Sequence, residues 1–272
     1  MGSNDIPPPH VSPYYLPITN TLLQVGGSLW TLCYILLARE SLLTKTYGMP
    51  LFALSFNFAW EVIYAFYVAE APLERGVFAI WCLLDCIMVY ALVLHGANEW
   101  KHAPFIARHL GKVFWIMTAW CCVGHWASAS WWIEQEMGRK EGKYYFGRVA
   151  ADTTELGFWS AGVSQAYLSA ASLGQLVIRQ HTGGVSWGIW VTRASGSLIG
   201  LYLNYGAMWY MWREAHEYFM SPFGVFLWGT ALVCDLIYPF VFAEIRKTEE
   251  VLPDGRKVVG GNKVHANGKK AL

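Results

Sequence analysis

Charged residues are scarce in this chain: Asp, Glu, Lys and Arg make up 14% of its 272 residues, whereas hydrophobic residues make up 55%. A soluble domain usually has about 25% charged residues, so this chain cannot cover a surface of ordinary size with solvated side chains. The net charge of +1 gives no electrostatic reason for binding nucleic acid. The composition therefore indicates an integral membrane protein with the lipid bilayer as its surroundings.

A disulfide framework and a cleavable signal peptide are also missing. Cysteine inside apolar runs behaves as a small hydrophobic residue, so reduced, structural cysteines are expected. Residues 1–17 are polar and proline-rich, and the apolar run that follows is too long for a signal peptide. We expect an N-terminal arm over residues 1–17 and a retained helix after it. All six cysteines lie in apolar runs: Cys33, Cys82, Cys86, Cys121, Cys122 and Cys234.

The chain contains several long apolar windows. A run of about 20 such residues suffices to cross the hydrocarbon core of a bilayer as a helix. The sequence therefore predicts an all-α fold, a polytopic bundle of seven transmembrane helices that occupies residues 18–247. The charged, glycine-rich residues 248–272 are predicted to form a disordered tail. The windows are 18–38, 50–69, 77–95, 112–133, 155–178, 186–209 and 222–245.

The distribution of Lys and Arg predicts the orientation of this bundle. With seven spans, the side that carries the C-terminus holds about twice as many of these residues as the opposite side, which places it in the cytosol and the N-terminus in the lumen. Lys269 and Lys270 stand third and fourth from the end. This spacing resembles the dilysine signal that returns proteins to the endoplasmic reticulum. We therefore expect residence in that membrane.

Four ionisable residues stand well inside the predicted spans: Glu61, Asp85, Arg193 and Asp235. A charge at membrane depth costs at least ~2.5 kcal/mol, and such residues usually face a bundle interior and have a function. If all four share one cavity, three carboxylates and one guanidinium cannot all remain ionised, so at least one acid should be protonated. A buried neutral carboxylic acid suits general acid catalysis on an apolar substrate.

Three buried polar residues allow more than one interpretation. Asp85 is explained equally by a hydrogen bond between helices and by a direct role in the chemistry. Arg193 is interpreted as a counter-charge that tunes a carboxylate rather than as a substrate contact. His125 is more often a satisfied interhelical histidine than a lining residue.

Several further residues are candidate metal ligands or cavity walls. His95, Glu99 and His102 have loosely metal-like spacing but lie at a membrane edge without further histidine pairs, so no metal site is expected. Aromatic rings can stabilise cations in water-poor sites by ~2 kcal/mol or more, although most rings in membrane spans only fill space. The candidate lining residues, beside the ionisable ones, are Asn57, Trp60, Tyr64, Trp126 and Tyr238.

Three segments carry a resemblance to a known family. They are Asn57-Phe58-Ala59-Trp60-Glu61 in the second window, Asp85 followed by Glu99-Trp100 after the third, and Cys234-Asp235-Leu236-Ile237-Tyr238 in the last. In the order of these three segments and in the number of predicted helices, the chain resembles the fungal membrane-bound terpene cyclases. Members of that family cyclise prenylated aromatic meroterpenoids and indole diterpenes. The resemblance covers the whole length of the chain.

The resemblance implies an activity and two catalytic acids. The expected reaction is protonation of a terminal epoxide, or less often an alkene, on a lipophilic prenyl substrate, followed by ring closure through carbocations. No metal and no organic cofactor are implied, and the sequence has no aspartate-rich Mg²⁺ motif. The acids map to Glu61 and Asp235. Glu61 is expected to donate the proton because its neighbours are the more apolar, with Asp235 orienting Glu61 or the epoxide.

Two other classes of membrane protein, transporters and retinal proteins, share some of these features. A small proton-coupled transporter would also use seven helices with buried acids, but the chain lacks the internal repeats that transporters often have. A retinal protein needs a lysine inside a late span, and the last window has none before Lys247. The sequence therefore favours a terpene cyclase over a transporter or a retinal protein.

Overall fold

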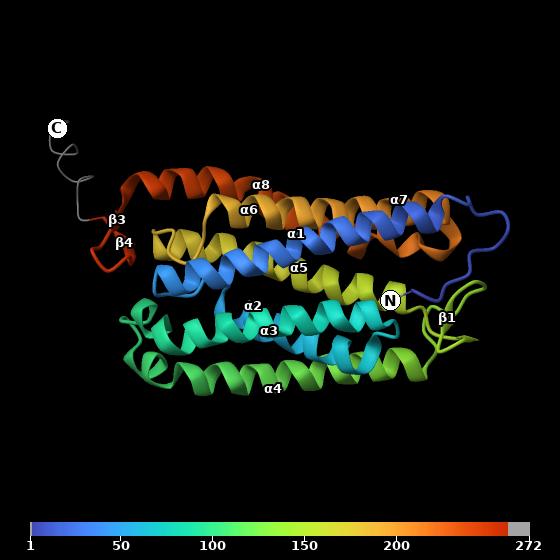
Figure 1. Ribbon diagram of the computed structural model, residues 1–272, viewed down its shortest axis with the longest axis horizontal. Helices are drawn as coiled ribbons and strands as arrows, with labels where there is room; N and C mark the ends of the chain where they lie inside the picture. The colour runs from blue at the N-terminus through green and yellow to red at the C-terminus, as the bar shows by residue number, and fades with distance from the viewer. Residues whose placement is uncertain (1, 261–272) are drawn as a thin grey trace.

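The computed structural model describes residues 2–260 and is dominated by long helices (Figure 1). Because α6, the π-helical η3 and α7 follow one another without a break, these residues form seven helical rods, one at each apolar window. The predicted all-α bundle is confirmed. The elements are α1 Tyr15–Leu43, α2 Leu51–Ile63, η1 Tyr64–Val68, α3 Pro72–His95, η2 Gly96–Glu99, α4 Pro104–Glu134, α5 Thr153–Arg179, α6 Trp187–Ser197, η3 Leu198–Leu203, α7 Asn204–Met211, η4 Arg213–Ala215, η5 Glu217–Met220 and α8 Pro222–Thr248.

Four of the rods are long and apolar enough to cross a membrane by length and composition alone: α1, α2 with η1, α3 with η2, and α8. The outward side chains agree with lipid surroundings. Ile116, Trp120 and Ile178 are all more than two-thirds exposed, whereas Glu61 and Asp85 are completely buried. The bundle thus carries apolar residues outside and charges inside, the arrangement that a bilayer favours.

Local sequence signals explain where several rods begin. Pro72, Pro104 and Pro222 each stand in a first helical turn, where the missing amide proton costs no hydrogen bond. The Asp152 carboxylate caps α5 by accepting from the amides of Thr154 at 2.9 Å and Glu155 at 3.0 Å. These caps define the connections from which the rods enter the bundle.

The rods are arranged in two groups, which meet through α5 and through a direct contact between α1 and α3 (Figure 1). One group contains α1, the α6–α7 rod and α8, and the other contains α2, α3 and α4. Gly26 on α1 meets Gly200 on η3 so closely that a Cβ on Gly26 would lie 2.4 Å from the Gly200 Cα. This contact holds α1 against the α6–α7 rod, as small residues do in membrane bundles.

The end that carries the N-terminal arm is closed by a buried ion cluster. Lys143 is fully buried, and its Nζ lies 2.8 Å from Asp5 Oδ2 and 3.4 Å from Asp152 Oδ2. His216 lies nearby, between the hydroxyl groups of Tyr15 at 2.8 Å and Tyr218 at 2.6 Å. The cluster joins the arm to the connection after α4, where β1 Tyr144–Tyr145 pairs with β2 Arg148–Val149.

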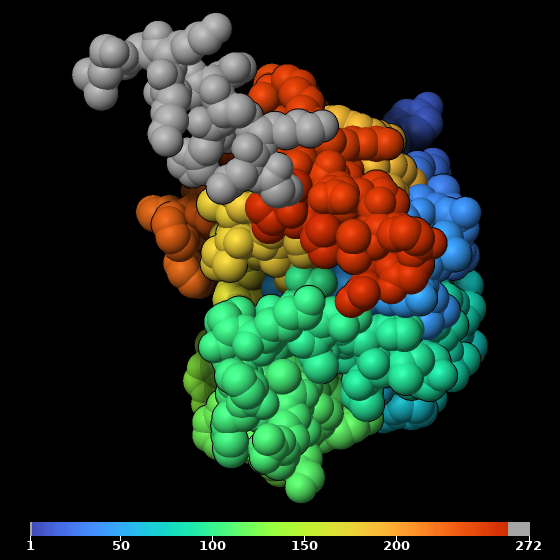
Figure 2. All heavy atoms as spheres, turned by 90° about the vertical axis from the view of Figure 1, so that its left-hand side faces the viewer, coloured from blue at the N-terminus to red at the C-terminus, as the bar shows by residue number. Residues whose placement is uncertain are grey.

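The opposite end carries a second hairpin, which the sequence did not predict. Residues 248–272 were expected to be disordered, but β3 Glu249–Val251 pairs with β4 Lys257–Val259. Thr182 explains the order, because its hydroxyl bonds the Glu249 carboxylate and accepts from Lys257 Nζ at 2.7 Å. Figure 2 views this end, with the red C-terminal residues beside the green connection between α3 and α4. Lys269 and Lys270 lie outside the described residues.

Candidate active site

Two acids from neighbouring helices meet in the interior. Asn57 and Glu61 stand one turn apart on α2, so their side chains share a face. The Asn57 amide lies 2.9 Å from Glu61 Oε1 and 3.0 Å from Asp85 Oδ2 on α3. Tyr34 on α1 donates its hydroxyl proton to Glu61 Oε1 at 2.5 Å. Asp85 is therefore part of the Glu61 site.

This acid pair, Glu61 with Asp85, has no compensating cation among its hydrogen-bond partners within residues 2–260. Each carboxyl group keeps one buried oxygen without a hydrogen-bond partner in that range, Oε2 of Glu61 and Oδ1 of Asp85. Two neighbouring carboxylates that are fully buried in a protein interior cannot both be ionised. The geometry is therefore suited to a pair that holds at least one proton.

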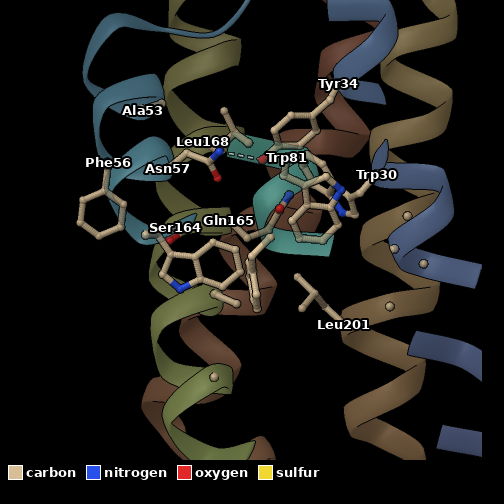
Figure 3. A pocket seen from close by; sticks show the side chains of 18 of the residues that line it. Trp30, Tyr34, Ala53, Phe56, Asn57, Trp81, Ser164, Gln165, Leu168 and Leu201 are labelled. Carbon is tan, nitrogen blue, oxygen red and sulfur yellow. Dashed lines mark hydrogen bonds between the residues drawn. The ribbon is translucent and has the colours of Figure 1, made fainter. Parts of the chain in front are cut away.

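A cavity of about 160 Å³ lies beside the acid pair (Figure 3). Residues of α1, α2, α3, α5, α6, η3 and α7 form its walls, and aromatic rings cover much of them. In Figure 3 the Tyr34 hydroxyl and the Asn57 amide meet at one side of this space. Among the lining residues, few carry a hydroxyl or amide group: Tyr34, Asn57, Ser164, Gln165, Tyr167 and Tyr205. The aromatic lining residues include Trp30, Phe56, Trp60, Phe78, Trp81 and Tyr167.

The other two ionisable residues form a separate pair. Arg193 on α6 donates to Asp235 Oδ1 on α8 at 2.8 Å, and both side chains are nearly buried. The guanidinium also lies over the Tyr238 ring, 4.9 Å from its centroid. The four intramembrane charges are thus divided between two places, and Arg193 neutralises Asp235.

Three aromatic residues that the sequence suggests as cavity-lining residues differ in their surroundings. Trp60 lines the cavity and donates its indole N–H to Ser160 at 3.1 Å. Tyr64, one turn further on, donates to the same Ser160 hydroxyl at 2.6 Å. Trp126 is 53% exposed and is not among the residues that line the cavity. It lies on the outer side of α4, whereas the neighbouring His125 and Ala129 are buried on the inner side.

Two further expectations concern histidines. His125 is buried on α4 with its ring 4.3 Å from that of Phe56, a cavity residue, so it stands behind the wall. Glu99 is held by protein partners: its carboxylate bonds His181 Nε2 at 3.0 Å and Thr46 at 2.6 Å. His102 stacks instead on Trp100.

Sequence reasoning did not single out several residues that the fold brings to the cavity. Tyr34, Trp30 and Gln165 line it, but the first two resemble ordinary aromatic residues of a span. Gln165 offered a detectable signal, because an amide inside an apolar window needs a partner; its Nε2 bonds Ser169 at 3.0 Å. The other two become visible only when α1 is placed against α2 and α3.

Comparisons with known proteins agree with this architecture. A family model described as Pyr4-like transmembrane terpene cyclases matches residues 3–248. The terpene cyclase ascF of Acremonium egyptiacum is 46% identical over 252 residues, which cover 93% of this chain and 90% of the relative. The Pyr4-family terpene cyclase mfmH of Annulohypoxylon moriforme is 33% identical, with 87% and 90% covered. The terpene cyclase paxB of Penicillium paxilli is 29% identical, with 87% and 89% covered.

No solved structure matches the chain.

Proposed function

The chain belongs to the Pyr4-like transmembrane terpene cyclases, and we propose that it protonates the terminal epoxide of a prenylated aromatic substrate and closes rings through carbocations. The relatives are named as terpene cyclases, which supports the class of reaction. The observation that carries the rest is the uncompensated acid pair beside an aromatic cavity. Such a pair can hold a proton in a place where an apolar substrate can bind.

The reaction begins with the acid pair. Glu61 supplies the proton, and the epoxide C–O bond breaks so that its electrons form a hydroxyl group on the substrate. Asn57 holds the Glu61 carboxyl in place by a contact of 2.9 Å to Glu61 Oε1, and it links this group to Asp85 by a contact of 3.0 Å to Asp85 Oδ2. General acid catalysis of this kind contributes about 10²–10⁴-fold to a rate.

The aromatic walls act on the cation that results. The π electrons of the next alkene of the prenyl chain attack the cationic carbon, and the charge moves along the folded chain as rings close. Trp30, Trp60 and Trp81 line this space, and a desolvated cation over the face of such a ring gains about 2 kcal/mol or more. The last cation loses a proton and the acid pair recovers one, so the reaction is an isomerisation overall.

Asp235 takes part as a positioning residue. Its carboxylate is bonded to Arg193, so in this proposal it does not orient Glu61 directly. Arg193 stands one turn before Gly196, which lines the cavity. The pair therefore holds α8 against the α6 wall, and both members are needed for the shape of the cavity.

The membrane setting is also part of the proposal. The protein is an integral membrane protein, and we place it in the endoplasmic reticulum with the N-terminus in the lumen and the C-terminus in the cytosol. The basis is the distribution of Lys and Arg together with Lys269 and Lys270. Protease protection of tags at the two ends in intact microsomes tests the orientation, and digestion of both tags together contradicts it.

The activity is tested by product analysis. Microsomes that contain the protein are given a panel of prenylated aromatic compounds in epoxidised and unepoxidised forms. Cyclised isomers are expected from epoxides, and none from the same membranes with Glu61→Gln at equal protein level. If the wild-type protein leaves every epoxide unchanged, or converts only unepoxidised compounds, the proposed reaction is wrong.

A further inference from the structure

The acid pair does not reach the cavity by itself. Both Glu61 and Asp85 are 0% exposed, and within the described residues the cavity walls include neither of them. Tyr34 and Asn57 do line the cavity, and both contact the Glu61 carboxyl. A substrate in the cavity therefore meets the tyrosine hydroxyl and the amide before it meets a carboxyl group.

We propose that Tyr34 is a further catalytic residue: its hydroxyl touches the epoxide oxygen and relays the proton of the acid pair to it. The Tyr34 O–H bond breaks as the proton passes to the epoxide oxygen. In the structure the Tyr34 hydroxyl donates to Glu61 Oε1 at 2.5 Å. In the reactive state Glu61 Oε1 carries the proton of the acid pair and passes it to the Tyr34 oxygen across this contact, while the Tyr34 hydroxyl turns its own hydrogen to the epoxide oxygen. The epoxide C–O bond breaks with its electron pair on oxygen. Tyr34 ends neutral, Glu61 ends ionised, and the substrate carries the positive charge.

The amide of Asn57 is arranged to assist this transfer. Its nitrogen lies 2.6 Å from the Tyr34 oxygen, 2.9 Å from Glu61 Oε1 and 3.0 Å from Asp85 Oδ2. An amide nitrogen has two hydrogens, so it can serve two of these three acceptors at once. As the Tyr34 oxygen gains negative charge during transfer, a hydrogen bond from Asn57 stabilises it without any movement of the backbone.

Two indole rings fix the tyrosine in the position that the relay needs. Trp81 stacks on the Tyr34 ring with centroids 5.8 Å apart and an angle of 15° between the planes. Trp30 contacts it edge-on at 6.0 Å. Both indoles line the cavity, so the residues that hold Tyr34 also border the place where the first cation forms. A preorganised donor of this kind requires little reorganisation during the reaction.

The inference rests on the proposed function, and the first test uses Tyr34→Phe, which keeps the ring and removes the hydroxyl. The value of kcat should fall by at least about 100-fold with a nearly unchanged KM, because the donor is lost while the walls remain. Tyr47→Phe is the matched control: Tyr47 is also a buried tyrosine with a tryptophan partner, Trp100 at 2.8 Å, but lies at the C-terminal end of the bundle. A kcat within threefold of wild type for Tyr34→Phe overturns the relay.

A second test separates chemistry from packing. Incorporation of 3-fluorotyrosine at position 34 makes the phenol a better donor to the epoxide oxygen and a weaker acceptor of the Glu61 proton, and it changes the size of the ring little. The value of kcat should therefore differ from that of the wild type by about twofold or more, with a direction that shows which of the two transfers limits the rate. An unchanged kcat in the fluorinated protein overturns the relay, since a structural hydroxyl does not respond to its acidity. The proposed function is distinguished by Glu61→Gln: if that variant keeps cyclising, the acid pair is wrong, whereas an inactive Glu61→Gln with a fully active Tyr34→Phe removes only the relay.

Discussion

Glu61 and Asp235 are both buried acids at membrane depth, but their partners differ in kind. Glu61 is bonded to a phenol, which can exchange a proton with it, and to an amide that also bonds a second acid. Asp235 is joined to Arg193, which cannot give up its proton in a protein. The two sites therefore have the same residue class and the same burial, with opposite chemical consequences.

This difference shows how a membrane protein can assign proton transfer to one buried acid and the packing of helices to another. A carboxylate with a guanidinium partner stays ionised and holds helices together. A carboxyl next to a second carboxyl retains a proton, because two neighbouring negative charges without a cation are too costly. Burial alone identifies neither role, so the partner decides it.

The largest expected effect comes from removing the acid of the Glu61 site. Glu61→Gln keeps the size and hydrogen bonding of the side chain but cannot donate a catalytic proton, so turnover should fall by about 10²–10⁴-fold while protein level persists. Asp85→Asn should reduce turnover less, because the donor remains. The amount of product formed per amount of membrane protein measures the turnover of both variants. Substantial turnover by Glu61→Gln would show that Glu61, like Asp235, is not the proton donor.

The next effect concerns stability at the Asp235 site. Removing one member of a buried ion pair costs about 3–5 kcal/mol, since the other charge is left unpaired. Asp235→Leu and Arg193→Met should each lower the unfolding temperature in detergent much more than Glu61→Gln does, and activity should fall with the shape of the α6 wall. The double variant Arg193→Met with Asp235→Leu should be more stable than either single variant. Additive losses in the double variant contradict the pairing.

A smaller effect tests the wall that the two sites share. Gly26→Ala should destabilise the protein by about 1–3 kcal/mol, because the added Cβ meets the Gly200 backbone at 2.4 Å. Gly27→Ala is the matched control on the same helix, since its added Cβ has its nearest neighbour, Trp81, at 4.0 Å. The unfolding temperatures of the two variants provide the measurement. Equal shifts would mean that the contact between α1 and η3 does not limit the packing.

The smallest effect extends the comparison to a buried base outside the spans. Burial, followed by the charges of Lys143 and Lys140, holds the pKa of His216 well below its usual value. The unfolded chain takes up a proton below about pH 6.5 and the folded chain resists it, so stability is full above that pH and is lost as the pH falls, by at most about 1.4 kcal/mol per pH unit. His216→Gln should flatten this acid dependence of the unfolding free energy. An unchanged slope in the variant assigns the acid sensitivity to another group.

Much of the fold could be predicted because membrane helices leave a direct record in sequence. Windows of about 20 apolar residues coincide with the rods, since every backbone polar group in hydrocarbon must be bonded within a helix. The hairpin at Glu249–Val259 was missed for the opposite reason. Its charged, glycine-rich sequence carries no such signal, and its order depends on Thr182 from another connection.

The sequence by itself determined that this chain is a helical membrane bundle with Glu61, Asp85, Arg193 and Asp235 inside it. A charged residue within an apolar window is rare because it is costly to place in hydrocarbon, so each of the four can be recognised from its position alone. Only the tertiary structure decided which of them meet. The rotation of each helix about its axis and the close contact of α1 with η3 set the partners, and these depend on side-chain packing between segments far apart in the chain. For that reason Tyr34 stands between the acid pair and the cavity, although nothing in its own window distinguishes it from other aromatic residues.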